Sequence, residues 1–311
     1  MDHSADKKFA LALTGDAILT RSVVSGGELP DEFGPVVEWI READAAMTNL
    51  EVVLTDGEDY ATPPRTVRDQ YQYLGSFPGI VLPSHPTKAD ELQAMGFNLF
   101  ATASNHSLDF GRCGMASTME ALEERNAAYA GLGLDLAEAR APAYSHSAGT
   151  RVGLVNATAS VPPGGEAGET SSHLPGRPGV SPLHVEWTYR VAEERLKQLR
   201  EIGEETGLTE IADTWLRREE PDPLTAGDYR FGHMTFESAD GGEPGIELST
   251  YEPDAEEILG QVREAASTAD LVIASVHAHQ GPGGTRHVSD RHYFLDYFSR
   301  DCGDAGACGF G

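Results

Sequence analysis

Cysteine is scarce in this chain of 311 residues, which contains only Cys113, Cys302 and Cys308. An odd number of cysteines without a C-x-x-C spacing argues against a disulfide framework and against a zinc knuckle. We expect Cys113 to be a small core residue.

Basic residues are also few. Lysine and arginine together number 23 against 50 aspartates and glutamates, which gives a formal net charge of −27. Nucleic acid and anionic membranes repel a polyanion, so both are excluded as expected partners. An acidic shell solvates a protein, and salt screens its self-repulsion. The composition therefore predicts a halophilic protein of a salt-adapted, haloarchaeal cytosol.

Long hydrophobic runs are absent. No stretch approaches the ~18 apolar residues that a membrane span requires. The first eight residues, Met1 to Lys8, lack the apolar region of a signal peptide. We therefore expect a cytoplasmic protein without a membrane span.

Short apolar runs alternate with amphipathic segments along the chain, which predicts an α/β architecture. The expected strands are 9–13, 45–54, 96–100, 128–130, 151–157 and 271–276, with a strand-like stretch at 229–236; the expected helices are 35–42, 115–126, 185–205, 255–267 and 290–301. We expect a single domain over 1–311. A proline-rich flap at about 56–86 and an acidic insert at about 160–250 interrupt it.

Polar residues follow four of the predicted strands. They are Asp16, then Asn49 and Glu51, then Asn105 and His106, and finally His277 and His279. If the strands are neighbours in one sheet, these groups converge on one edge. Carboxylate, amide oxygen and imidazole are the ligands of hydrolytic centres that use Mn, Fe or Zn. Because side chains alternate along an extended segment, His277 and His279 lie on one face.

Each residue also has a simpler interpretation. A lone Gly-Asp after a strand is more often a turn or a helix N-cap than a ligand. Glu51 by itself would be a surface charge, Asn105 a turn residue and His106 a structural histidine. The coincidence of all four positions favours a shared site. His85, between Pro83 and Pro86, is a further residue at the edge of this site.

The order of these motifs resembles a known family. Gly15-Asp16, Asn49-Leu50-Glu51, the element Asn105-His106-Ser107-Leu108-Asp109-Phe110-Gly111 and a strand ending in His277 are similar to the CapA/PgsA family. These are poly-γ-glutamate capsule biosynthesis proteins of the calcineurin-like metallophosphatase superfamily. The resemblance implies a metallophosphatase-like β-sandwich flanked by helices, with one or two divalent metal ions.

The resemblance also implies roles for individual residues. Asp16 and His277 would be metal ligands, and Asn105 would ligate a second metal. His106 would be the proton-donating catalytic histidine, and Glu51 would bridge or support the metals. Asn49 and Asp109 would lie at the edge of the site.

Two departures from the family are visible. Many relatives have His-Trp-Gly-Glu where this chain has His277-Ala278-His279-Gln280, so His279 would supply part of the missing function. The chain also ends at Gly311 without the family's Gly-His-x-x-His element and its last strands. We favour truncation by a frameshift or early stop over a shorter design. Loss of those ligands predicts weak or mononuclear metal binding.

Three functions remain open. The first is a metal-dependent hydrolase of capsule biosynthesis that acts on a phosphoester or handles the anionic polymer. There the metal would activate a water held through Asp16 and Asn105 while His106 protonates the leaving oxygen. The second is a non-catalytic binding or assembly partner of capsule synthase subunits. The third is an inactive truncated product.

Overall fold

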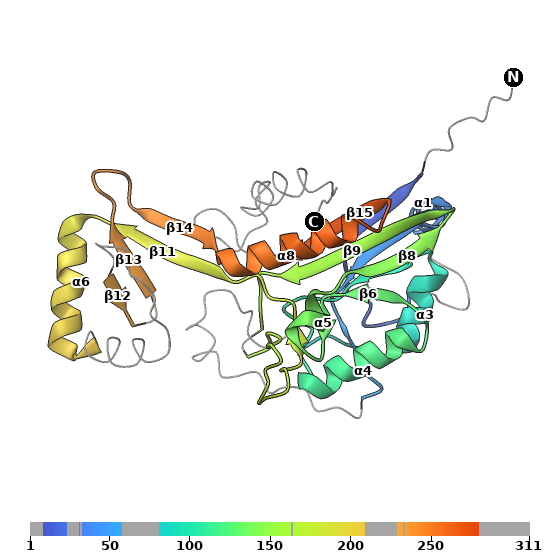
Figure 1. Cartoon of the computed structure of the whole chain (residues 1–311), viewed down its shortest axis with the longest axis horizontal. Coiled ribbons are helices and arrows are strands. Elements are labelled where there is room, and N and C mark those ends of the chain that lie inside the picture. Colours follow the sequence, from blue (N-terminus) through green and yellow to red (C-terminus); the bar gives the residue numbers. More distant parts are fainter. Residues whose placement is uncertain are drawn as a thin grey trace, which may run out of the picture. The chain divides into compact units, whose positions relative to one another are not determined.

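The computed structural model describes residues 9–23, 31, 33–57, 81–162, 164–208, 229–232 and 234–279. The chain divides into two compact units (Figure 1). Of the described residues, those in 9–184 and 252–279 form unit 1, and those in 185–251 form unit 2.

The first sheet of unit 1 is entirely parallel. Its strands lie in the order β1-β2-β5-β6, with bounds β1 Leu11–Ala17, β2 Ala45–Leu50, β5 Leu99–Ala101 and β6 Ala128–Ala130. Helices α1 (Gly34–Glu42), α3 (Thr87–Ala94) and α4 (Gly111–Glu123) connect these strands. Their buried side chains, such as Ile40, Leu92 and Leu122, pack with Phe100 in one apolar cluster that covers one face of the sheet. Parallel strands joined by helices place all their carboxyl ends at one edge.

The second sheet of unit 1 has the order β15-β9-β8. Its strands are β8 Ala143–Ser147, β9 Thr150–Thr158 and β15 Leu271–His277. Strand β15 runs parallel to β9, and β8 runs antiparallel to it. Helix α8 (Glu252–Ala266) lies along β9 and β15 (Figure 1) and buries Ile258 and Val262.

A continuous apolar layer joins the two sheets. Met47 and Leu99 from the first sheet pack with Val152, Leu154 and Ile273 from the second, and all five are buried. Unit 1 is therefore a sandwich of two sheets with helices on both outer faces. Short elements complete it, namely β3 (Val53–Leu54) paired with β4 (Pro83–Ser84), β7 (Leu132–Gly133) paired with β10 (Gly179–Val180), and α5 (Leu136–Arg140).

Unit 2 contains a second, smaller sheet in the order β12-β13-β11-β14. Its elements are β11 (Val185–Val191), α6 (Glu193–Thr206), β12 (Tyr229–Phe231), β13 (Met234–Ser238) and β14 (Gly245–Thr250). Tyr189 of β11 stacks on Phe236 of β13, with ring centroids 5.1 Å apart. Helix α6 packs on β12 and β13 and ends at Gly207, which adopts the left-handed conformation.

The α/β architecture predicted from the sequence is confirmed, and most predicted elements lie within a few residues of the observed ones. The helix predicted over 185–205 is wrong in its first third, where Val185, Trp187, Tyr189 and Val191 alternate along a strand. Cys113 is exposed rather than buried in the core. Most of the predicted flap, the helix at 290–301 and the predicted loss of closing strands lie outside the described residues. The single domain stays a prediction.

Candidate metal centre

The inner faces of both sheets change from apolar to polar at their carboxyl ends. In the first sheet, Ala45 and Met47 of β2 face the apolar layer, and Asn49 and Glu51 follow at the next alternate positions. In the second sheet, Ile273 of β15 faces the same layer and His277 lies four residues further on the same face. Pleat alternation therefore brings polar groups from both sheets to one end of the sandwich.

A β-bulge places Asp16 in this group. Leu13 is opposite Met47, but Asp16 rather than Gly15 is opposite Asn49, so one extra residue is present between the two pairs. The extra residue turns Asp16 to the side where Asn49 lies. The sequence predicted that the strand ends before Asp16, and this is wrong because β1 continues to Ala17.

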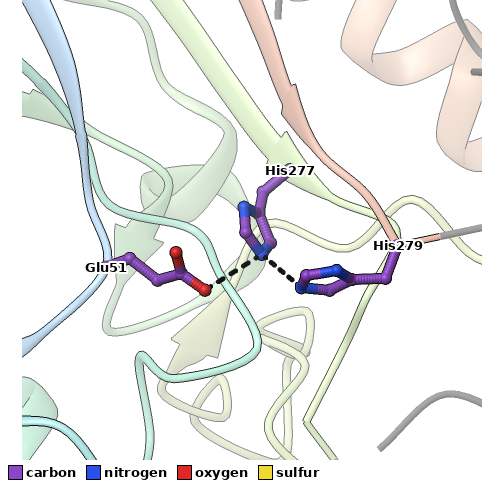
Figure 2. Close-up of side chains that lie close together, drawn as sticks. All are labelled: Glu51, His277 and His279. Carbon is purple, nitrogen blue, oxygen red and sulfur yellow. Dashed lines mark hydrogen bonds and ion pairs between the residues drawn. The ribbon is translucent and has the colours of Figure 1, made fainter. Parts of the chain in front are cut away.

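Three possible metal-binding side chains meet at this end (Figure 2). Glu51 Oε1, His277 Nε2 and His279 Nε2 all lie within 4.8 Å of one another. His277 Nε2 is 3.5 Å from Glu51 Oε1 and 3.2 Å from His279 Nε2. Asn105 Oδ1 lies 2.7 Å from His277 Nε2 and 3.3 Å from His279 Nε2. Glu51 and His277 are buried, whereas His279 is exposed.

The distances of 3.2, 3.3 and 3.5 Å are close to those between ligands of one first-row metal ion, whereas the 2.7 Å between Asn105 Oδ1 and His277 Nε2 is a hydrogen-bond distance. Two ligand atoms that each lie about 2.1 Å from one ion are about 3.0–3.4 Å apart in octahedral or tetrahedral geometry. The one hydrogen that His277 Nε2 can carry points well at only one of its neighbours. A cation satisfies all four lone pairs at once. Glu51, Asn105, His277 and His279 are thus a chemically suitable set of donors.

Asp16 and Asn49 contact the opposite nitrogen of His277. Asn49 Nδ2 lies 2.7 Å from Asp16 Oδ1 and 3.2 Å from His277 Nδ1, and Asp16 Oδ1 is 3.6 Å from the same nitrogen. A carboxylate beside the second ring nitrogen, such as that of Asp16, orients a metal-binding histidine and raises its basicity by accepting the proton on that nitrogen. Among the described residues, no donor reaches the buried Asn49 Oδ1. It is a further oxygen at this centre with unused acceptor capacity.

Opposite pKa shifts distinguish the two carboxylates. Hydrogen bonding to His277 holds the pKa of Asp16 well below its usual range, although burial opposes this. Burial raises the pKa of Glu51 to about 7, and the neighbouring Asp16 adds to that rise. A buried carboxylate beside another carboxylate either takes up a proton or requires a compensating positive charge to stay ionised. This electrostatic environment favours a bound cation.

His106 forms a dyad with Asp109 next to these residues. His106 Nδ1 donates to Asp109 Oδ2 at 2.8 Å, and the same carboxylate oxygen accepts the backbone N–H of Leu82. This bond leaves His106 Nε2 as the nitrogen directed at the centre, 4.0 Å from Glu51 Oε1. Burial lowers the pKa of His106, but the hydrogen bond and charge of Asp109 outweigh it, so the net shift is upward.

The remaining predicted residue, His85, lies apart from this group. It is exposed, and its Nδ1 is 2.9 Å from Thr87 Oγ1 at the start of α3. The structure thus brings together Asp16, Asn49, Glu51, Asn105, His106, Asp109, His277 and His279, and no described contact joins His85 to them.

Two supporting residues were not predicted. Ser160 Oγ accepts the backbone N–H of His279 at 2.9 Å, and Asn156 bonds to the segments that precede Asn105 and His277. The sequence could have indicated Asn156, because it is a polar residue in an apolar strand and follows Val152 and Leu154 at the alternate positions that face inward. No pattern in the sequence indicated Ser160.

Known proteins resemble this chain over nearly its whole length. Two proteins of Sinorhizobium fredii (strain NBRC 101917 / NGR234), named uncharacterized protein y4sH and uncharacterized protein y4uA, are each 29% identical to it over 303 residues. Each alignment covers 96% of this chain and 59% of the relative, so the chain spans about three fifths of these curated relatives. Among solved structures, a putative 5'-nucleotidase from Staphylococcus aureus in complex with alpha-ketoglutarate aligns with a TM-score of 0.36 at 12% identity. That alignment covers 94% of this chain and 43% of the solved one.

No helix among the described residues combines the length and apolar character needed to cross a membrane.

The family comparison is more specific. The model of the bacterial capsule synthesis protein family PGA_cap matches residues 10–307, which include every residue of the centre described above. This chain therefore belongs to the bacterial capsule synthesis protein family PGA_cap.

Proposed function

We propose that this chain is a metal-dependent hydrolase of capsule biosynthesis that cleaves a phosphoester at the centre between the two sheets. The observation that carries the proposal is the convergence of four donor atoms, from Glu51, Asn105, His277 and His279, beside the His106–Asp109 dyad. The motif order resembles that of poly-γ-glutamate capsule proteins, so the substrate class that we propose is a phosphoester precursor of an anionic capsule polymer.

The donor atoms suit Mn, Fe or Zn, because they combine oxygen with imidazole nitrogen. Glu51, Asn105, His277 and His279 would hold the ion, and Asp16 and Asn49 would orient His277 through its other nitrogen. When bound, one or two such ions supply a nucleophilic water near neutral pH and neutralise charge on the phosphoryl oxygens.

His106 has the geometry of a general acid. Asp109 accepts the proton on Nδ1 and fixes the orientation of the ring, so Nε2 presents its proton to the leaving oxygen. The carboxylate of Asp109 is itself held by the N–H of Leu82. Because two hydrogen bonds already fix these side chains, they lose little orientational freedom, and therefore little entropy, when the substrate binds.

The test uses the desalted full chain, bis(p-nitrophenyl) phosphate as probe, and added Mn²⁺ or Zn²⁺ in 2 M KCl. We expect turnover that requires the metal and falls about 10²–10⁴-fold in His106→Ala, which is the usual contribution of a general acid. His146→Ala is the matched control, because His146 is an exposed histidine of β8 paired with Arg151 at the amino end of β9.

Two results would contradict the proposal. Equal turnover in His106→Ala and the wild type would remove His106 from the mechanism. Tight metal binding without turnover on this probe or on phosphorylated capsule precursors would indicate a binding or assembly role with capsule synthase subunits.

A further inference from the structure

Asn156 is a buried polar residue between the two sheets of unit 1. Its side chain follows Val152 and Leu154 on the inner face of β9, and the residue is 1% exposed. A buried amide in an apolar layer is costly unless its donors and acceptor are satisfied. The contacts of this amide therefore show what it contributes.

The amide bonds to both sheets at once. Asn156 Oδ1 accepts the backbone N–H groups of Thr102 at 2.9 Å and of Ala103 at 2.7 Å, directly after β5 of the first sheet. Asn156 Nδ2 donates to the carbonyl of Ser275 at 3.1 Å, in β15 of the second sheet. One side chain thus connects the carboxyl ends of strands in the two sheets.

These contacts lie next to two of the donor residues in sequence. Asn105 is two residues beyond Ala103, and His277 is two residues beyond Ser275. The atoms of interest, Asn105 Oδ1 and His277 Nε2, lie 2.7 Å apart although they come from different sheets. The hydrophobic effect that holds the apolar layer together is non-directional, whereas hydrogen bonds restrict both distance and angle, so the bonds of Asn156 restrict this distance more closely.

The neighbouring backbone leaves room for this amide. Gly131 adopts a φ of +110°, and a Cβ atom at that position would lie 2.3 Å from Asn156 Oδ1 and 2.7 Å from the Ala103 nitrogen. Any larger residue at 131 would displace the oxygen or the N–H that it accepts. The local sequence is therefore consistent with a tightly placed amide.

We propose that Asn156 is a positioning residue that sets the separation of Asn105 and His277 and thereby the metal affinity of the centre. The part that concerns the metal rests on the proposed function. Among the described residues, no hydrogen bond joins Asn156 to the four donor atoms, and its bonds go to the backbone that carries two of them. Residues that support metal ligands in this way typically change affinity about 10–100-fold when they are replaced.

Three variants of the full chain separate positioning from general stability. Asn156→Leu keeps the approximate volume and removes all the hydrogen bonds. Asn156→Asp keeps an acceptor for Thr102 and Ala103 but places a second oxygen against the carbonyl of Ser275. Asn98→Leu is the matched control, because Asn98 Oδ1 accepts the N–H of Ala46 at 3.1 Å near the amino end of β5, away from the centre.

Two measurements are made on each variant. Calorimetric titration with Zn²⁺ gives the affinity of the centre. Long-range ¹H–¹⁵N spectra of the histidine rings, recorded without metal, report whether His277 Nε2 still hydrogen-bonds to Asn105. We expect about 10–100-fold weaker Zn²⁺ binding and an altered His277 ring in Asn156→Leu. Asn156→Asp should lose less Zn²⁺ affinity than Asn156→Leu, and Asn98→Leu should match the wild type in both readouts.

Wild-type affinity together with an unchanged His277 ring in Asn156→Leu would overturn the inference. Equal losses in Asn98→Leu would also overturn it, since they would show a general effect of removing an amide that hydrogen-bonds to the backbone. Wild-type protein that binds no Zn²⁺ would refute the proposed function, and the ring spectra would still decide whether Asn156 fixes the His277–Asn105 contact. If Asn156→Leu does not fold, Asn156→Asp decides by the same readouts.

Discussion

Asp254, in the first turn of α8, is the centre of a charge cluster in unit 1, in which Asp254 and Arg140 are buried and His184 and Glu257 are exposed. Its Oδ1 accepts from Arg140 at the end of α5, and its Oδ2 accepts the backbone N–H of His184 at 2.8 Å and His184 Nδ1 at 2.6 Å. Arg140 is 4% exposed and also pairs with Glu257. The cluster lies where the chain leaves unit 1 after His184 and re-enters it at Glu252. We expect Asp254→Asn to destabilise unit 1 strongly.

The expected loss in the free energy of unfolding follows from the burial of Asp254 and Arg140. Removing one partner of a buried ion pair costs about 3–5 kcal/mol, and Glu257, which still pairs with Arg140, keeps the expected loss toward the lower end of that range. With an m-value of about 3 kcal/mol/M for urea, the midpoint should fall by about 1–1.7 M. Urea titrations followed by circular dichroism at constant KCl measure it. Asp90→Asn is the control, because Asp90 is 53% exposed where it pairs with Arg125, and exposed pairs contribute less than about 1 kcal/mol. Equal shifts in the two variants would refute the reasoning.

Three further predictions concern pH, metal and salt. The hydrogen bond to Asp254 raises the pKa of His184 in the folded chain, so this interaction stabilises the fold fully below the unfolded pKa of about 6.5 and is lost as pH rises through the folded value. Urea midpoints measured at pH values from 5.5 to 8.5 should therefore fall less with rising pH in Asp254→Asn than in the wild type. Parallel curves of midpoint against pH would contradict this. Zn²⁺ at about 100 times its dissociation constant should add about 2.7 kcal/mol to the stability of the wild type and little to His277→Ala; equal increases in calorimetric melts would exclude His277 as a ligand. Because the net charge is −27, we expect the melting temperature to rise with KCl over 0.1–3 M, and a flat response would end the proposal of salt adaptation.

The sequence was sufficient for much of the architecture because strand and helix periodicities are local. The runs at 151–157 and 271–276 are buried strands with few polar residues, and they became β9 and β15. The segment 185–205 was less clear. Its acidic half forms α6, but Val185, Trp187, Tyr189 and Val191 pair with β13 and β14 in a sheet whose partner strands lie more than 40 residues away in sequence. A pattern in one segment carries no information on such partners.

The candidate centre was predictable in composition and less so in geometry. Polar residues at strand ends pointed to Glu51, Asn105 and His277, and the structure brings their side chains together. The sequence did not show that two sheets rather than one contribute these residues, because inter-sheet packing depends on the whole apolar layer. It also did not show which nitrogen of His277 each neighbour contacts. That depends on side-chain rotamers, which the fold determines collectively.

The bulge in β1 makes the orientation of Asp16 depend on one extra residue. Leu13 and Asp16 are opposite Met47 and Asn49, so three steps along one strand match two along the other. If the same residues formed a regular ladder, Gly15 would be opposite Asn49, and Asp16 would turn to the outer face, where Ala12 and Ala17 pack with Val37 and Ile40 of α1. Deleting Gly15 would restore a regular ladder and keep Asp16 opposite Asn49 on the inner face. Loss of the bulge alone would therefore remove the carboxylate from the centre, whereas loss of the bulge together with Gly15 would retain it, and a library of point substitutions would not sample that deletion.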